Sequence, residues 1–328
     1  MAQQNQLSRY GAISRVIPGL APGSKVFIVA DSDDTTVGPD NLAANFPPDE
    51  EGVVRVFTTI QSAQNAAREN NGDVVLVSPG YNLAHSRADS WTTAGVQIRG
   101  MGEGFNRPTL TYNDTAASVD LTANGILVDN IKFVSSVSGC RLALDMSVDV
   151  EGQIVRNCEF GFDATGDDFI TSIRLGSKRS LVENNAILME TDTTGPRAGI
   201  SFVFGDPDFS VIQNNYITGQ FDTVSDTNNS HGAIVQDSIA DTGDTQLNGL
   251  LIKGNVIQSG DTTAARLIAF SDGCVNRGMV VGNLMSTMDS ATADTTQVVV
   301  DASLWLHNYL KRGDTEEKLV ADSFVIAN

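Results

Sequence analysis

A short hydrophobic pattern recurs through the middle of the chain. Each copy begins with two apolar residues and has an Asn at its fourth position, its fifth position or both. The copies begin at Leu127, Ile154, Leu181, Val211, Leu251 and Met279 and read LVDNIKF, IVRNCEF, LVENNAI, VIQNNYI, LIKGNVI and MVVGNLM. Successive copies start 27, 27, 30, 40 and 28 residues apart. One structural unit therefore recurs, with insertions between copies.

A second strand-like segment lies between successive copies. These segments are residues 141–144, 172–175, 200–203, 233–235, 266–269 and 297–300, each bounded by Gly, Ser, Asp or Asn. Units with at least two short strands and no amphipathic helix exclude helical solenoids, and they lack the Leu spacing of leucine-rich repeats. The pattern predicts an all-β fold, a parallel β-helix of about seven coils. At about 4.8 Å per coil, the rod would be roughly 35 Å long.

The repeat also predicts which side chains face inward and where the chain bends. Val128, Val155, Val182, Ile212, Ile252 and Val280 occupy equivalent positions, so we expect them to stack in a dry interior. We expect the recurring Asn to occupy the bend, because Asn tolerates the left-handed backbone conformation and its amide can bond to neighbours. Stacked coils would place these amides in a ladder.

The lead-in to the repeats predicts a cap. Residues 53–57 read as a strand, and Thr58 with Gln61 three positions on fits a capping box. Ile60, Ala63 and Ala67 would share one face of a short helix that ends at Asn70-Asn71-Gly72. Residues 73–81 then read as a strand that runs into a turn.

This lead-in resembles the start of a known superfamily. The helix TIQSAQNAA, then GDVVLVSPGYN and GVQIRGMG up to Gly102, are similar to the capped start of the right-handed parallel β-helix (pectin-lyase-like) superfamily, which includes pectate lyases, polygalacturonases and bacteriophage tailspikes. The resemblance covers roughly residues 53–303 and is greatest to the β-helix proteins of phage virions, of the capsid-decoration or tailspike type. It implies the fold and leaves the function open, because this fold hosts lyases, hydrolases and structural virion proteins.

Composition and charge narrow the class of protein. The 328 residues are 41% hydrophobic, and 40 Asp and Glu against 21 Lys and Arg give a net charge of −19. Such a surface repels nucleic acid and anionic membranes, so we expect neither as a partner. The first residues contain no basic and apolar leader, which predicts that no secretory signal is present. Cys140, Cys158 and Cys274 are odd in number and widely spaced, and we interpret them as buried thiols.

The two ends differ from the repeats and complete a three-part division of the chain. Residues 1–52 read as an attachment or capping segment, 53–303 as the β-helix, and 304–328 as a C-terminal cap or oligomerisation tail that covers the open sheet edge. Asp31 to Asp34 only partly fit a calcium loop, because position six is Thr36 and position twelve is Leu42. A solvated acidic loop is the favoured interpretation.

Residues that could carry chemistry are few. Asp167-Asp168 and Ser230-His231-Gly232 resemble in part the aspartate pair and Gly-His-Gly of polygalacturonases, but the flanking motifs are absent, and a turn between coils is favoured for the aspartates. The histidines His85, His231 and His307 have no metal-ligand spacing, and acidic clusters at Asp222, Asp226, Asp237, Asp241 and Asp244 read as solvated loops. Trp91 and Trp305 are expected outside the coil core, with Tyr216 outward. We assign no catalytic, cofactor-binding or metal-ligating residue and no cofactor, with calcium at the acidic loops left open.

The sequence and the resemblance are compatible with three functions. The favoured one is a non-catalytic structural virion protein of a bacteriophage, a capsid decoration or cement protein or another surface-exposed β-helix component. It would be assembled in the host cytoplasm as a homotrimer on the virion surface, with major capsid or tail proteins as partners. The alternative is a tailspike-like polysaccharide depolymerase or lyase that acts on a host surface glycan. The third is a host adhesin passenger. The phage context comes from the resemblance alone.

Overall fold

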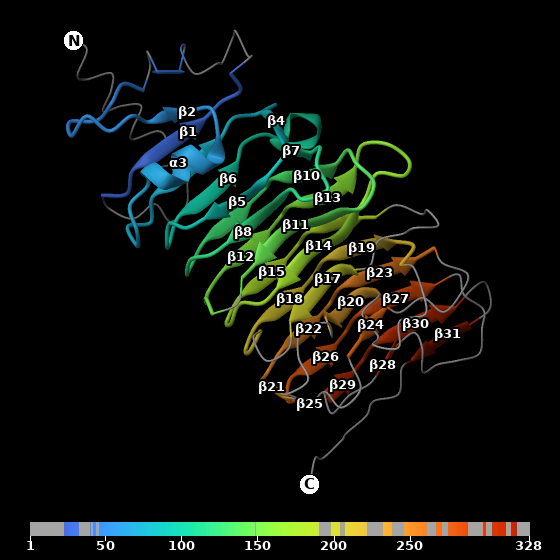
Figure 1. The fold of residues 1–328 in the computed structure, drawn as a ribbon. Coiled ribbons are helices and arrows are strands. Elements are labelled where there is room, and N and C mark those ends of the chain that lie inside the picture. Colours follow the sequence, from blue (N-terminus) through green and yellow to red (C-terminus); the bar gives the residue numbers. More distant parts are fainter. Residues whose placement is uncertain are drawn as a thin grey trace.

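The computed structural model describes residues 23–32, 40, 42–43, 46–147, 149–189, 198–203, 207–221, 232–237, 246–260, 267–270, 275–287, 298–299, 304–312 and 316–319. Within these residues the chain winds into a rod built from three long sheets (Figure 1). The helices are α3 (Ile60–Ala66) and the 3-10 turn η1 (Gly104–Asn106). No described helix is long and apolar enough to cross a membrane.

Every coil contributes strands to the same sheets. Sheet A runs in the order β2 (Val56–Phe57), β1 (Val26–Val29), β3 (Val74–Val77), β6 (Gln97–Gly100), β9 (Leu127–Asp129), β12 (Ile154–Arg156), β15 (Leu181–Glu183), β18 (Val211–Gln213), β22 (Leu251–Lys253), β26 (Met279–Val281) and β29 (Leu304–Leu306). Sheet B runs from β4 (Asn82–His85) through β7 (Thr109–Tyr112), β10 (Lys132–Ser135), β13 (Glu159–Phe162), β16 (Ala186–Leu188), β19 (Tyr216–Gly219), β23 (Val256–Ser259), β27 (Leu284–Thr287) and β30 (Tyr309–Arg312) to β31 (Glu316–Leu319). Sheet C runs from β5 (Ala88–Trp91) through β8 (Ser118–Leu121), β11 (Cys140–Met146), β14 (Phe169–Leu175), β17 (Ala198–Val203), β20 (Gly232–Asp237) and β24 (Ile268–Ala269) to β28 (Val298–Val299). A small fourth sheet pairs β21 (Gln246–Leu247) with β25 (Val275–Asn276).

This topology confirms the predicted fold. Except for the last pair of sheet B, β30 with β31, successive strands of each long sheet pair in parallel, one coil after the next, and crossovers between parallel strands coil right-handed. The molecule is therefore a right-handed parallel β-helix. Its coils hold three strands, in agreement with the expected minimum of two, and the described residues form eight complete coils, from β3–β4–β5 to β26–β27–β28, and part of a ninth. The prediction of about seven coils was too low because the sequence repeat is recognisable only from Leu127 onward.

The strands also extend beyond both limits of the range 53–303. β1 lies in sheet A between β2 and β3, so part of segment 1–52 belongs to the rod. At the other end β29 and β30 continue sheets A and B, and β31 pairs antiparallel with β30 at the edge of sheet B. The functions assigned to the two ends stay predictions.

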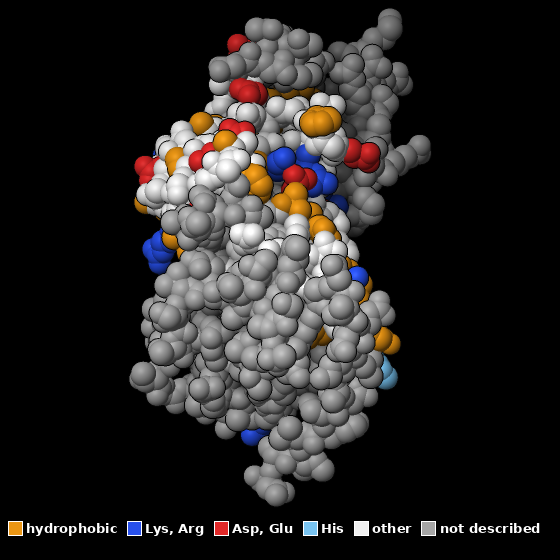
Figure 2. All heavy atoms as spheres, turned by 90° about the vertical axis from the view of Figure 1, so that its right-hand side faces the viewer, with side chains coloured by type: hydrophobic (Ala, Val, Ile, Leu, Met, Phe, Trp, Pro, Cys, Tyr) orange, Lys and Arg blue, Asp and Glu red, His pale blue; other side chains and the backbone are white. Residues whose placement is uncertain are grey.

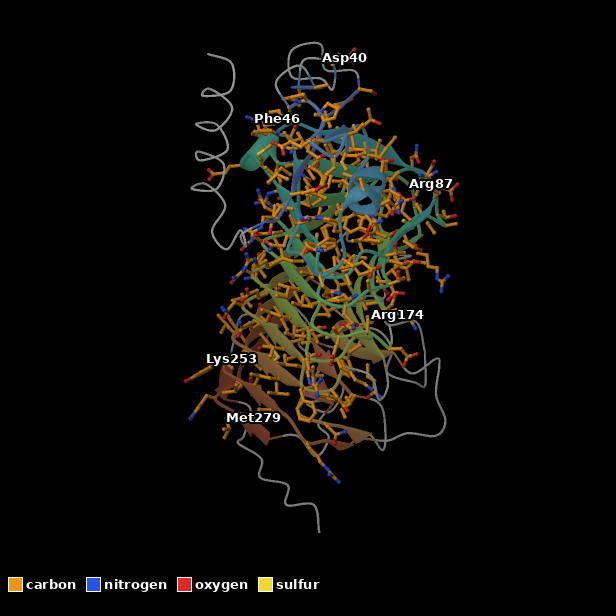
Figure 3. All side chains as sticks on the ribbon, turned by 90° about the vertical axis from the view of Figure 1, so that its left-hand side faces the viewer. Asp40, Phe46, Arg87, Arg174, Lys253 and Met279 are labelled. Carbon is orange, nitrogen blue, oxygen red and sulfur yellow. The ribbon has the colours of Figure 1, made fainter. Side chains whose placement is uncertain are left out.

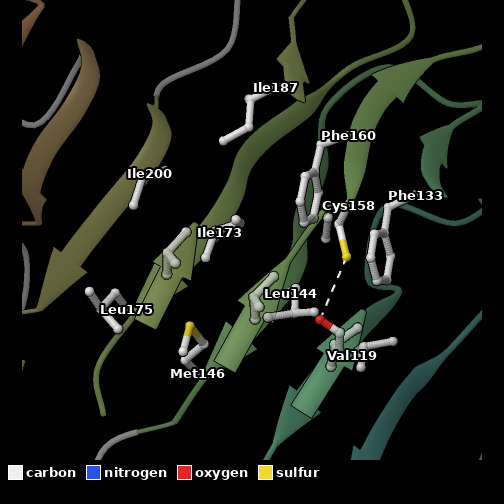
Figure 4. Close-up of a cluster of buried hydrophobic side chains, with 14 of the residues drawn as sticks. Val119, Phe133, Leu144, Met146, Cys158, Phe160, Ile173, Leu175, Ile187 and Ile200 are labelled. Atoms are coloured by element: carbon white, nitrogen blue, oxygen red, sulfur yellow. Dashed lines mark hydrogen bonds between the residues drawn. The ribbon is translucent and has the colours of Figure 1, made fainter. Parts of the chain in front are cut away.

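The interior is a set of stacked apolar columns. The predicted column is confirmed: Val128, Val155, Val182, Ile212, Ile252 and Val280 lie in register, and each is 0% exposed. In sheet B, Phe133 and Phe160 stack with ring centroids 4.9 Å apart and an interplanar angle of 8° (Figure 4). Each fully buried side chain of this size contributes about 2 kcal/mol.

At the bend between sheets A and B, turning the chain and forming the amide ladder are done by two adjacent residues, whereas the repeat predicted one Asn for both. The left-handed position is filled, coil after coil, by Asn130, Asn157, Asn184, Asn214, Gly254, Gly282 and His307, with φ between 52° and 65°. The next residue points inward, and there Asn185, Asn215, Asn255, Asn283 and Asn308 form the amide ladder, with Nδ2 of each donating to Oδ1 of the next at 3.0, 3.0, 2.9 and 2.9 Å. The ladder is confirmed, but the residues that bend the chain are not the residues that form it.

The N-terminal end of the core is closed by α3. Its N-cap is Thr59 rather than the predicted Thr58, and the Thr59 hydroxyl accepts a hydrogen bond from the Ser62 backbone N–H. Ile60 and Ala63 pack into the core, and the buried Gln64 accepts from the backbone N–H groups of Thr92 and Thr93 through Oε1. Trp91 was expected outside the core but is 1% exposed within it. Trp305 lies in register with Val280 along sheet A, and its side chain lies outside the described part of the chain.

Candidate functional site

The Asp168 carboxylate is buried and takes part in hydrogen bonds that hold a turn between coils. It lies between β13 and β14, is 5% exposed, and its Oδ1 accepts a hydrogen bond from the Gly139 backbone N–H at 2.6 Å. Its backbone carbonyl accepts from the Cys140 N–H, and the Asp167 N–H donates to the Ala164 carbonyl. This carboxylate therefore ties a turn to the neighbouring coil. His231 and the acidic residues Asp222, Asp226, Asp241 and Asp244 lie outside the described residues, as do Asp33, Asp34 and the side chain of Asp237.

The cysteines fit the interpretation as buried thiols where they are described. Cys140 and Cys158 are free and buried, and burial raises the pKa of Cys140 to about 11 and of Cys158 to about 12. Cys274 lies outside the described residues. Within the described part of the chain, no group of three or more His, Cys, Asp or Glu residues is arranged to hold a metal ion.

A row of polar residues on the outer face of sheet C is a better candidate for chemistry. Asp120, Asp145, Arg174 and Ser201 come from β8, β11, β14 and β17, and strand pairing places each beside the next. Parallel strands lie about 4.8 Å apart, so the row runs along the rod axis at that spacing. Figure 3 shows Arg174 on the opposite side of the rod from Lys253 and Met279.

The two carboxyl groups of this row differ in their environment. Burial raises the pKa of Asp145 to about 6; Arg174, whose Nη1 lies 3.5 Å from Asp145 Oδ2, lowers it, and Asp120 raises it further. Asp120 accepts a hydrogen bond from the Ser118 hydroxyl at 3.0 Å. Two neighbouring carboxyl groups in such unlike environments can divide the roles of acid and base.

Beside the carboxyl pair lie two hydrogen-bonding groups with spare capacity. Arg174 Nε and Ser201 Oγ are both buried and have no hydrogen-bond partner within the described residues, and Ser201 is 4% exposed. Buried donors without partners are costly. The accessible groups of the row are the Arg174 and Asp145 side chains, which are 29% and 18% exposed. A carboxylic acid beside a guanidinium can donate a proton to a ligand oxygen and balance negative charge there.

The row is not recognisable from the sequence pattern alone, because its residues come from different coils. The strand expected at 141–144 stops one residue before Asp145, whereas β11 runs from Cys140 to Met146. The residues of the row are 25, 29 and 27 positions apart, and only the register of sheet C brings them together. Aligning the sheet C strands by their buried positions, Leu144 with Ile173 and Ile200, would have revealed it.

A small hollow lies beside α3, at the capped end of the core. Its volume is about 170 Å³, and its lining includes Ile60, Gln61, His85, Asp89 and Trp91. His85 lies in β4 and is 3% exposed; its Nε2 lies 2.9 Å from the Ser118 carbonyl oxygen, and its Nδ1 lies 3.7 Å from Asp89 Oδ2. Because a carbonyl oxygen can only accept, the Nε2 atom carries the hydrogen. The imidazole thus links the first two coils.

No protein-family model matches the chain, and neither does any curated protein. Among solved structures, the chain is similar to the pectin methyl esterase of rice weevil, with 12% identity over 88% of this chain and 98% of that one and a TM-score of 0.43. It is also similar to ORF18 of Geobacillus virus E2, with 12% identity over 77% of this chain and 57% of that one and a TM-score of 0.35. The fold follows from the strand pairing described above, and neither likeness says what this chain does.

Proposed function

We propose that this chain is a structural protein of a bacteriophage virion, a capsid decoration or cement protein or another surface-exposed β-helix component. Copies would stand side by side as a homotrimer on the particle, after assembly in the host cytoplasm, with major capsid or tail proteins as partners. The observation that carries the proposal is the continuous coil-to-coil bonding. The Asn ladder joins every coil from Asn185 to Asn308, and the core column is uninterrupted beside it. A rod bonded in this way is suited to standing rigidly on a surface.

The phage assignment is supported by the resemblance of the lead-in to the superfamily that includes tailspikes. Under the proposal, the segment before β1 contacts the particle, and the chain after Trp305 closes the far end of the rod or the seam between subunits. Removing residues 1–22 tests the first part, because β1 then stays in sheet A beside β3. The full chain should sediment with particles of the phage that encodes it, and the shortened chain should not. Equal sedimentation of both would refute the attachment role.

The row on sheet C favours a second candidate function, cleavage of a host surface polysaccharide. The observation is the raised pKa of Asp145, about 6, beside Asp120 and Arg174. An acid with a pKa in this range can donate a proton to a leaving oxygen while the second carboxylate acts as base or nucleophile. Activity that depends on protonated Asp145 would fall as pH rises above about 6.

Two matched variants separate these functions. The purified chain would be incubated with host capsular polysaccharide, and released oligosaccharides would be measured. Under the structural proposal no oligosaccharide is released. If cleavage occurs and Asp145→Asn abolishes it while Asp168→Asn retains it, the second function holds and the row is its site. Asp168→Asn is the control because an amide oxygen can still accept from the Gly139 N–H.

A further inference from the structure

The outer face of sheet B changes character halfway along the rod. From β16 to β30 its outward positions are Ala186, Leu188, Tyr216, Thr218, Val256, Gln258, Leu284, Ser286, Tyr309 and Lys311, here called the neutral face. They face outward because the alternate residues, from Ile187 to Leu310, fill the core. In the earlier strands the two corresponding rows are Asn82, Thr109, Lys132 and Glu159, and Ala84, Thr111, Val134 and Gly161, so the charged residues of the earlier half are Lys132 and Glu159.

Large apolar side chains are exposed on the neutral face. Tyr216 is 39% exposed, Leu284 53% and Tyr309 51%, and strand pairing places Val256 between the first two and Leu284 directly beside Tyr309. The Tyr216 hydroxyl donates to Gln258 Oε1 at 2.9 Å, which holds the ring in place. A contiguous exposed apolar row that is already ordered is typical of an interaction surface.

Charge singles out the same face. The chain has 40 acidic residues and a net charge of −19, yet the neutral face has no acidic residue and its single charged residue is Lys311. The acidic residue that precedes it in the row, Glu159, is paired with Lys132 at 2.9 Å and Arg107 at 3.3 Å. Figure 2 shows a few hydrophobic side chains, a basic side chain and a histidine along the right-hand margin of the lower half, and no acidic side chain among the coloured atoms of that margin.

Resting on the proposed assembly of several copies, we infer that the neutral face is the surface through which one copy contacts a second copy of this chain. Two chains of charge −19 repel each other over most of their surfaces, and contact is favourable only where acidic groups are missing on both sides. The neutral face meets that condition and runs along the rod axis over five coils, the direction in which two parallel rods touch. At the end of sheet B, β31 pairs antiparallel with β30 and is the edge strand of the described sheet.

The test compares the mass of the full chain with that of variants, by sedimentation velocity at micromolar concentration. The wild type should have a multiple of the 34.8 kDa chain mass. Leu284→Asp combined with Tyr309→Asp should have the mass of the monomer, since the two carboxylates meet their copies across the contact. Thr111→Asp, outward on the same sheet but outside the neutral face, should keep the wild-type mass.

Leu284→Ser with Tyr309→Ser provides a second measurement in case the aspartate variant does not fold, and it should also be monomeric. A monomeric wild type, or an oligomer that survives in either double variant, overturns the inference. Binding to particles is measured separately on the same samples. A wild-type oligomer that dissociates as described but does not bind particles would refute the proposed virion function and leave the contact surface standing.

Discussion

Replacing Asn215 by Ala should destabilise the protein far more than replacing the preceding Asn214 by Gly. The Asn215 side chain is buried, and its Oδ1 accepts from the backbone N–H and the side-chain amide of Asn185, both at 3.0 Å. Its Nδ2 donates to the Val182 carbonyl and to Asn255 Oδ1, both at 3.0 Å. Truncation leaves the buried Asn185 N–H without its acceptor and removes three further bonds. At about 1–3 kcal/mol for the orphaned group and about 0.5–1.5 kcal/mol for each other bond, the loss is about 4 kcal/mol.

Asn214→Gly is the matched control for this experiment. Asn214 is exposed with φ 55°, and the same position in the next two coils is Gly254 and Gly282. Glycine adopts this conformation freely but gains entropy in the unfolded chain, so we expect a change within about 1 kcal/mol. Urea unfolding followed by circular dichroism measures both variants, with slopes compared because repeat proteins can depart from two-state behaviour. Equal midpoints for the two variants would refute the division of roles at the bend.

Three further predictions concern single side chains. Val155→Asp places an unpaired charge between Val128 and Val182 in the dry core and should cost several kcal/mol, about 4 or more, in thermal or urea unfolding; wild-type melting would contradict the register. Burial raises the pKa of Asp145 to about 6, above the ordinary range of an aspartate, so the folded protein binds this proton more tightly than the unfolded chain. Stability relative to Asp145→Asn should therefore be greatest below pH 4 and fall as pH rises to about 6, by at most about 3 kcal/mol; a pH-independent difference would show that this carboxyl ionises normally. Asp168→Ala should cost about 1–2 kcal/mol through the lost Gly139 N–H bond, and an unchanged unfolding midpoint would show that the bond contributes nothing.

The fold was predictable because the interior column repeats in the sequence. An inward position of a coil is apolar in every copy, so Val128 and Val280 can be matched across the whole chain without knowledge of the structure. The first coils were harder, since β4 to β8 do not repeat the Asn pattern and Trp91 has no counterpart in later copies. The cap shows the usual uncertainty of one residue, because Thr58 and Thr59 are both competent N-caps and only packing selects Thr59.

The polar features of the bend and of the outer faces were harder to predict than the apolar core, because they require the register of the strands. At the bend the sequence shows Asn at two adjacent positions, and only the backbone angles separate Asn184, which turns the chain, from Asn185, which bonds to the next coil. The row of Asp120, Asp145 and Arg174 joins residues from three coils and requires the pairing of sheet C. The neutral face is defined by its lack of acidic residues, which the sequence shows only after the outward positions of sheet B are known.

The central claim is that this chain is a structural part of a phage particle, and the protein content of purified particles tests it most directly. Particles of the phage that encodes the chain would be purified by density gradient and their proteins quantified by mass spectrometry against the major capsid protein. The account predicts the chain in a fixed, reproducible ratio to that protein, retained through repeated banding. Complete, infectious particles that band without it, with the chain left in the soluble fraction, would contradict the account.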